Sequence, residues 1–111
     1  AWLAIHERFG GNFLDWEGLD DEHAFLWHRQ LHIFEVPFYY IEYGIAQLGA
    51  LQLWSNARND PKTALANYKK ALALGGSRPL PELFETAGIK FDFSPKTIAP
   101  LVEVIKQHIG V

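Results

Sequence analysis

The chain has 111 residues, enough for one domain with a hydrophobic core, and its 49% hydrophobic and 21% charged residues are typical of a globular protein. A formal net charge of −3, with ten scattered basic residues, argues against a nucleic-acid partner, because phosphate binding needs clustered Lys and Arg. The lack of cysteine excludes disulfides and thiolate metal sites and favours the cytoplasm, and no apolar run is long enough to span a membrane. The chain begins with Ala1 rather than methionine, so we expect a fragment of a longer protein.

The N-terminal third predicts two helices separated by an aromatic loop. Residues 2–9 have apolar side chains at helical spacing, and Gly10-Gly11-Asn12 is a typical helix end. The run of acids at 20–22 suits the positive end of a helix dipole, so a second helix is expected over about 21–34. Its expected core contacts are Phe25, Leu26, Leu31 and Phe34. Val36 precedes a proline and is pushed towards extended geometry, which predicts a sharp break.

The rest of the chain is organised around one long helix, predicted over about 37–57. Pro37 suits the first helical turn, where its missing N–H would have no intrahelical partner. Apolar residues lie around most of the circumference, so we expect this helix to be buried. They are Ile41, Ile45, Leu48, Leu51 and Leu53. Tyr39 and Tyr43 are four residues apart, which would place both phenols on one helical face.

Two glycines, Gly44 and Gly49, interrupt the apolar pattern of this helix. Each costs on the order of 1 kcal/mol relative to alanine. Glycine at such positions permits the close approach of another backbone, and we expect a neighbouring helix rather than a substrate chain.

Three further helical segments follow. Asp60-Pro61 is a cap followed by a proline at the first helical position, and Gly75-Gly76 ends this helix. Its expected buried stripe is Ala64, Leu65, Tyr68, Ala71 and Leu72. A short helix at 80–86 is closed near Gly88, and the alternating 91–93 is too short for a strand and is expected to be a connector. Ser94-Pro95 then caps a helix to about 109, in which Pro100 should produce a kink or delay the start. The predicted fold is all-α, with about five helices.

One histidine pair has the spacing of a metal site. His28 and His32 are four apart, as in two zinc-binding imidazoles on one helical face. The motif is HRQLH, however, which lacks the acidic residue of HExxH and has no third ligand at a recognisable spacing. We therefore predict no metal site in this chain, with one histidine facing solvent and the other facing the core. The adjacent His6 and Glu7 are a still weaker candidate.

Several separated motifs resemble, in the same order, the C-terminal part of oligoendopeptidase F-type zinc peptidases, relatives of thimet oligopeptidase. They are QLHIF at 30–34, PFYYIEY at 37–43, AQLGAL at 46–51, LGGS at 74–77, LPELF at 80–84, AGI at 87–89 and FDFS at 91–94. The similarity covers nearly the whole chain from about Trp16. It implies that residues 1–111 are a helical domain or fragment from the C-terminal part of a metallopeptidase catalytic domain. It places the HExxH helix and the acidic third zinc ligand upstream of Ala1, so the chain alone should be inactive and bind no zinc.

The resemblance also implies roles for particular residues. Carried over onto this sequence, the histidine and helix-borne tyrosines that donate to the developing oxyanion fall on His32, Tyr39 and Tyr43. Phenol and imidazole groups are suitable donors for that charge. The gap between histidine and tyrosines varies in the family, so Tyr40 is an alternative to Tyr39. Tyr40 and Glu42 are candidate substrate contacts, and Glu42 is alternatively a carboxylate that holds a tyrosine or histidine in place. Without the resemblance, these tyrosines and His32 would be amphipathic packing residues.

Two classes of function follow. The first is a wall of an oligopeptidase cleft, with an oligopeptide substrate and the upstream zinc-bearing part of the same protein as partners, and without nucleic acid or membrane. The second is a free-standing helical interaction module, because DPKTALANYKKALAL at 60–74 resembles one tetratricopeptide helix. Repeat folds stack several units of about 34 residues, and only one helix here fits that pattern.

Overall fold

A computed structural model describes residues 1–10 and 13–111, which divide into two compact units, Ala1–Tyr40 and Ile41–Val111. All regular elements of the described residues are helices, so the all-α prediction is confirmed. Where about five helices were expected, these residues form seven α-helices and one 3-10 helix. None of the helices described is long and apolar enough to cross a membrane.

The first unit contains the helices α1 (Trp2–Gly10), α2 (Asp20–Phe25), η1 (Leu26–Arg29) and α3 (His32–Glu35). The prediction of one helix over 21–34 is wrong. Phe25 (φ −104°, ψ 6°) and Gln30 (φ −92°, ψ 86°) leave helical geometry, and the turn between them tightens to a 3-10 helix, which is stable only in short pieces. The predicted end of the first helix at Gly11-Asn12 lies outside the described residues.

Ring contacts hold the first unit together. The predicted core contacts Phe25, Leu31 and Phe34 are each more than half exposed, and no described residue of this unit is fully buried. Instead α1 packs on α2 through two tryptophans and two histidines. The indole N–H of Trp2 donates to the His23 carbonyl at 3.0 Å, and the ring of Trp16 stacks on that of His23 at 4.4 Å.

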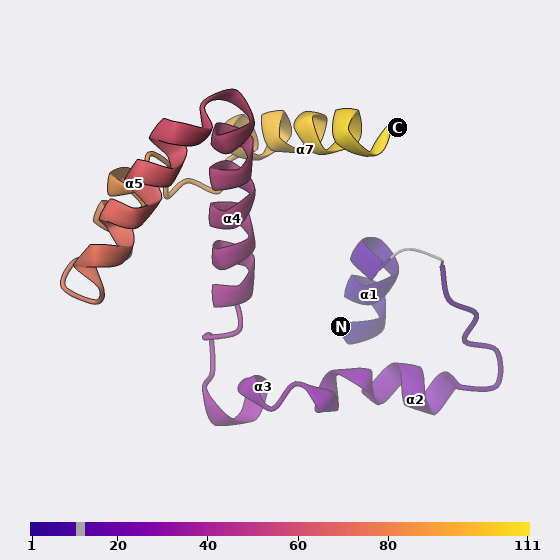
Figure 1. The fold of residues 1–111 in the computed structure, drawn as a ribbon. Helices are drawn as coiled ribbons and strands as arrows, with labels where there is room; N and C mark the ends of the chain where they lie inside the picture. Colours follow the sequence, from indigo (N-terminus) through magenta and orange to yellow (C-terminus); the bar gives the residue numbers. More distant parts are fainter. Residues whose placement is uncertain (11–12) are drawn as a thin grey trace. The chain divides into compact units, whose positions relative to one another are not determined.

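The second unit contains α4 (Glu42–Asn59), α5 (Pro61–Leu74), α6 (Leu80–Thr86) and α7 (Pro95–Ile109) (Figure 1). The predicted start of α5 is confirmed: the Asp60 carboxylate accepts a hydrogen bond from the Thr63 N–H at 3.1 Å, and Pro61 is in the first turn. The predicted end of α6 is confirmed by Gly88, whose φ of 74° favours glycine. Helix α7 starts at Pro95 and continues past Pro100, so the start is not delayed. Residues 91–93 form a connector.

The long organising helix differs from its prediction in position and burial. It begins at Glu42 rather than near residue 37, ends at Asn59, and buries only Gly49 and Gln52. Its start is displaced because a hydrogen bond from Tyr39 to Val36 closes a turn before it. Its burial is low because α5, α6 and α7 cover only part of its circumference (Figure 1). The apolar pattern around the helix therefore predicted more burial than the packing of α5, α6 and α7 provides.

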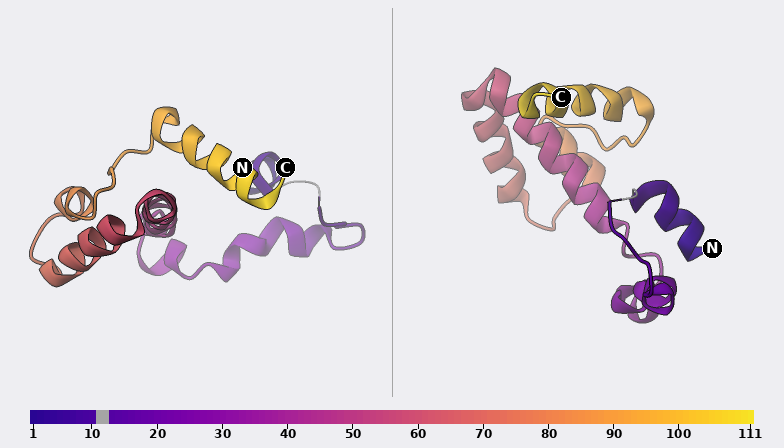
Figure 2. Two further views of the ribbon diagram at one scale, coloured as in Figure 1. Left: turned by 45° about the horizontal axis from the view of Figure 1, so that its top comes forward. Right: turned by 90° about the vertical axis from the view of Figure 1, so that its right-hand side faces the viewer.

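The core of the second unit is small and aliphatic. Its buried hydrophobic residues are Ala64, Ala87, Ile89 and Leu101. Of the predicted buried stripe on α5, Ala64 is buried, whereas Leu65, Tyr68 and Leu72 are 53%, 42% and 59% exposed. Figure 2 shows α5 and α6 on one side of α4 and α7 on another. The α7 contact includes His108, whose ring lies 5.2 Å from Trp54 and whose Nδ1 is 2.6 Å from a guanidinium nitrogen of Arg58.

Candidate active site

The candidate histidine, His32, is the first residue of α3 and is half-buried. Its ring centroid lies 5.3 Å from that of Tyr40, with the two planes inclined at 52°. The structure thus brings together two of the residues to which the sequence assigns catalytic and substrate-binding roles. Because of this contact, α3 and the residues that follow it up to Tyr40 form one local arrangement within the first unit.

A tight turn connects these two residues. The Tyr39 N–H donates to the Val36 carbonyl at 3.1 Å, and Pro37 and Phe38 lie between them. Phe38 has a φ of 66°, a left-handed conformation that costs a bulky side chain roughly 1 to 2 kcal/mol. Proline in the second position and a positive φ in the third fit a type II turn, where glycine is usual. Phe38 is 96% exposed, so its ring does not offset that strain by packing.

The remaining candidates, Glu42 and Tyr43, open helix α4 in the second unit. Ile41 is the N-cap residue and supplies no side-chain hydrogen bond. The carboxylate of Glu42 lies in the first turn, where the positive end of the helix dipole favours an anion. This position is favourable for the Glu42 carboxylate whether or not it also contacts a substrate. The Tyr43 side chain is 51% exposed.

One geometric prediction about the tyrosines is wrong. Tyr39 precedes α4, so it does not share a helical face with Tyr43. The physical reason is the turn at 36–39: Pro37 occupies a turn position rather than the first turn of a helix, and helical geometry resumes only at Ile41. His32, Tyr39 and Tyr40 belong to the first unit, and Glu42 and Tyr43 belong to the second.

The HRQLH spacing does not produce two imidazoles on one helical face. His28 lies in the 3-10 helix η1 and His32 lies in α3, with non-helical Gln30 between them. The His28 ring packs against Trp27 at 4.1 Å. Within residues 1–10 and 13–111, no group of three or more His, Cys, Asp or Glu side chains is placed to hold a metal ion. That this chain holds no metal site of its own stays a prediction.

Sequence reasoning missed a histidine pair in the first unit. His23 Nε2 lies 3.1 Å from His6 Nδ1, and the rings of Trp2 and Trp16 flank the pair. Seventeen residues separate the two histidines, so no local spacing signals the contact. The only sequence signal was the helical spacing of Trp2 and His6, which places both on one face of α1.

The described elements are thus all helices, and the candidate site residues carry imidazole, phenol and carboxylate groups. The model of Peptidase family M3 matches residues 2–101, nearly the whole chain, and the protein therefore belongs to this family of metallopeptidases. The family is generally zinc-dependent. Comparisons with curated proteins and with solved structures found no match.

Proposed function

We propose that residues 1–111 form the C-terminal part of the catalytic domain of an oligoendopeptidase F-type zinc peptidase, which hydrolyses peptide bonds in short peptides in the cytoplasm. The observation that carries this proposal is the family match over residues 2–101, and the ordered motifs that resemble this subfamily support the finer assignment. The chain supplies one wall of the substrate cleft. The resemblance to this subfamily assigns the HExxH zinc site to the upstream part of the same protein.

The catalytic role that we assign to this chain is donation to the oxyanion. When a peptide carbonyl becomes tetrahedral, negative charge develops on its oxygen, and a fixed N–H or O–H near that oxygen stabilises the transition state more than the ground state. His32, Tyr39 and Tyr43 are the proposed donors, and Tyr40 and Glu42 the proposed substrate contacts. The ring contact between His32 and Tyr40 supports a shared local arrangement, and it keeps Tyr40 open as the alternative to Tyr39.

The test is Tyr43→Phe in the complete enzyme, which removes one hydroxyl and leaves the ring. Loss of such a donor typically lowers kcat on the order of 100-fold to 1000-fold. KM should move much less, because the interaction is made in the transition state. His32 and Tyr39, replaced singly, should show the same pattern. Thr86→Val on α6, which also removes one hydroxyl but lies outside the proposed site, is the control and should leave kcat unchanged. An unchanged kcat for Tyr43→Phe with a lowered Tm would assign Tyr43 to packing.

The 111-residue chain by itself should neither bind zinc tightly nor hydrolyse peptides. Stoichiometric zinc after dialysis, together with turnover of a fluorogenic peptide, would contradict the proposal that the zinc ligands lie outside this chain. The alternative function, a tetratricopeptide-like interaction module, rests on the single helix α5 and predicts binding of a protein partner without catalysis.

A further inference from the structure

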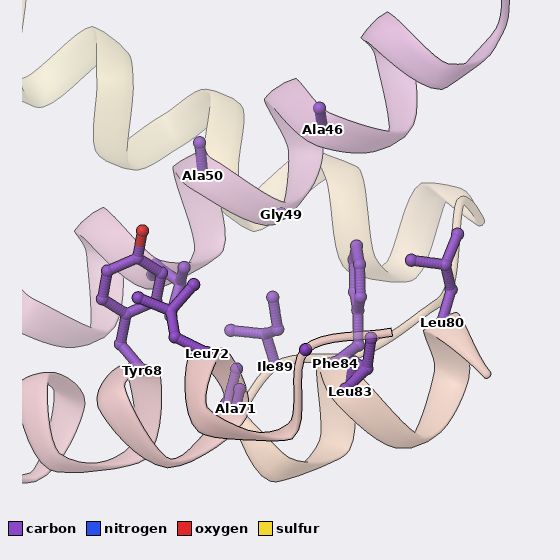
Figure 3. A pocket seen from close by; sticks show the side chains of 13 residues that line it. Ala46, Gly49, Ala50, Tyr68, Ala71, Leu72, Leu80, Leu83, Phe84 and Ile89 are labelled. Atoms are coloured by element: carbon purple, nitrogen blue, oxygen red, sulfur yellow. The ribbon is translucent and has the colours of Figure 1, made fainter. Parts of the chain in front are cut away.

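An open apolar groove runs through the second unit between α4 and α5, with α6 at one end (Figure 3). It consists of two depressions of about 390 and 320 Å³ that share Ala50, Leu53 and Tyr68. The first depression reaches Phe84 on α6, and the second reaches Pro61 at the start of α5. The groove therefore follows α5 over its whole length, which for 14 residues is about 21 Å.

The two walls of the groove are different. The α4 wall has small residues, Ala46, Gly49 and Ala50, at the end near α6, where Leu72 and Phe84 face them (Figure 3). Towards the other end, Leu53 and Trp54 give the α4 wall its bulk. The α5 residues at the rim stay exposed, by 53% for Leu65 and 59% for Leu72. Contiguous exposed apolar residues of this kind mark an interaction surface rather than ordinary solvent-facing positions.

Positive charge lines one edge of the groove. Lys62 is three residues before Leu65, and Lys69 is four residues after Leu65 and three before Leu72, so both lysines lie beside the apolar rim. Helix α5 carries three lysines and no acidic residue. The ion pairs found in the described part of the chain, Arg78 with Glu82 and Lys106 with Glu103, involve none of them. This edge therefore offers cations to an acidic partner.

The shape and charge of the groove define its occupant. The walls are helices whose backbone groups are already paired, so they offer no edge to an extended strand, and an occupant must satisfy its own backbone hydrogen bonds. That requirement selects an α-helix with an apolar stripe, about 14 residues long to match the groove. A second copy of this chain is disfavoured, because a two-fold contact through the same surface would bring Lys62 and Lys69 towards their own equivalents.

We propose that the groove receives an amphipathic helix from the zinc-bearing part of the same protein, with acidic residues along the flank that meets Lys62 and Lys69. This inference rests on the proposed function, in which that part lies upstream and must be held against this chain. Burial of Leu65, Tyr68 and Leu72 would supply the hydrophobic contribution, and the lysine edge would set the direction of the bound helix.

The test is thiol labelling at the rim of the groove. The chain has no cysteine, so Leu72→Cys introduces a single thiol into it, and peptide mass spectrometry reads the modification at that position. In the complete protein the thiol should react at least about tenfold more slowly than in the 111-residue chain, because the helix covers it. Ala66→Cys, which points away from the groove by helical spacing, is the matched control and should react equally in both. Equal reactivity of Leu72→Cys in both would overturn the proposal, and protection that disappears on dilution would assign the cover to a second copy instead.

The proposed attraction between the lysine edge and an acidic flank is tested in the complete protein that carries Leu72→Cys. Lys69→Glu should increase the labelling rate several-fold, because the acidic flank then meets a like charge, and the effect should shrink at high salt. Lys70→Glu, on the far side of α5, is the control and should change little. Equal effects of the two substitutions would overturn the proposal that the bound helix has an acidic flank. Labelling does not depend on turnover, so this result and that of Tyr43→Phe can fail independently.

Discussion

The two units are both helical, but different contacts hold their helices together. In Ala1–Tyr40, no described residue is buried, and α1 is held by rings and one indole hydrogen bond. In Ile41–Val111, a small aliphatic core is combined with buried polar contacts between α4 and the connector after α6. Local stability depends on buried apolar contacts and protected hydrogen bonds, so the second unit should be the more resistant to opening.

Hydrogen exchange tests this difference over the whole chain. Amides of α4 and α5 should be protected at least about 100-fold more than those of α1 and α2, because helices with few buried contacts open locally at low free-energy cost. Native-state exchange followed by mass spectrometry gives both values in one experiment. Equal protection in the two units would contradict the comparison.

Substitutions at the two glycines of α4 test two different effects: close packing at Gly49 and helix propensity at Gly44. A Cβ at Gly49 would lie 3.1 Å from Phe84 Cζ, so Gly49→Leu should destabilise the second unit by about 1 to 3 kcal/mol. A Cβ at Gly44 would meet only the Ile41 side chain at 3.9 Å, so Gly44→Ala should stabilise the helix by up to about 1 kcal/mol. Urea unfolding measures both, and a destabilising Gly44→Ala would show that our account of α4 is wrong.

Gln52 attaches α4 to the connector after α6. It is 8% exposed; its Nε2 donates to the Lys90 carbonyl, and its Oε1 accepts from the Lys90 N–H, both at 2.9 Å. Gln52→Ala removes both bonds, and we expect a loss of about 1 to 3 kcal/mol in the free energy of unfolding. Gln47→Ala, an exposed position on the same helix, should change it by less than about 0.5 kcal/mol. Similar losses for both would mean that the pairing contributes no more than helix propensity.

The smallest expected effect is a pH dependence confined to the second unit. Hydrogen bonds from Thr63 lower the pKa of Asp60, and hydrogen bonds from Thr97 and Ser94 lower the pKa of Asp92. A carboxyl whose pKa is lower when folded adds stability that is present above its unfolded pKa, near 3.8, and is lost as the pH falls through the folded value. The second unit should therefore lose stability below about pH 4, and Asp60→Asn with Asp92→Asn should flatten that slope. A slope unchanged in the double variant would contradict these assignments.

Much of the fold of the second unit could be predicted from sequence because its signals are local. Asp60 with Pro61, Ser94 with Pro95, and Gly88 each mark a helix end whatever surrounds them. The start of α4 could not be predicted, because proline suits the first turn of a helix and the second position of a turn equally well. The choice depended on the left-handed Phe38, a conformation that no pattern assigns to phenylalanine.

For the candidate site, the sequence indicated which residues to consider but not how they are arranged. The ordered motifs and their resemblance to a peptidase family identified His32, Tyr39, Tyr40, Glu42 and Tyr43 as candidates, and their roles stay predictions. Their arrangement could not be predicted: the contact of His32 with Tyr40 requires the break at Gln30 and the turn at 36–39 together. Burial was overestimated for α4 and α5, because an apolar stripe indicates a face to be covered and does not identify what covers it.

Donation to the oxyanion is tested most directly with a phosphinic peptide, whose tetrahedral phosphorus carries charged oxygens like those of the transition state. In the complete enzyme, Tyr43→Phe should raise the inhibition constant of this analogue by the same factor by which it lowers kcat/KM, on the order of 100-fold or more. The affinity for a cleaved product peptide should stay within a few-fold. A fall in kcat/KM without weaker binding of the analogue would contradict a role for Tyr43 as a transition-state donor.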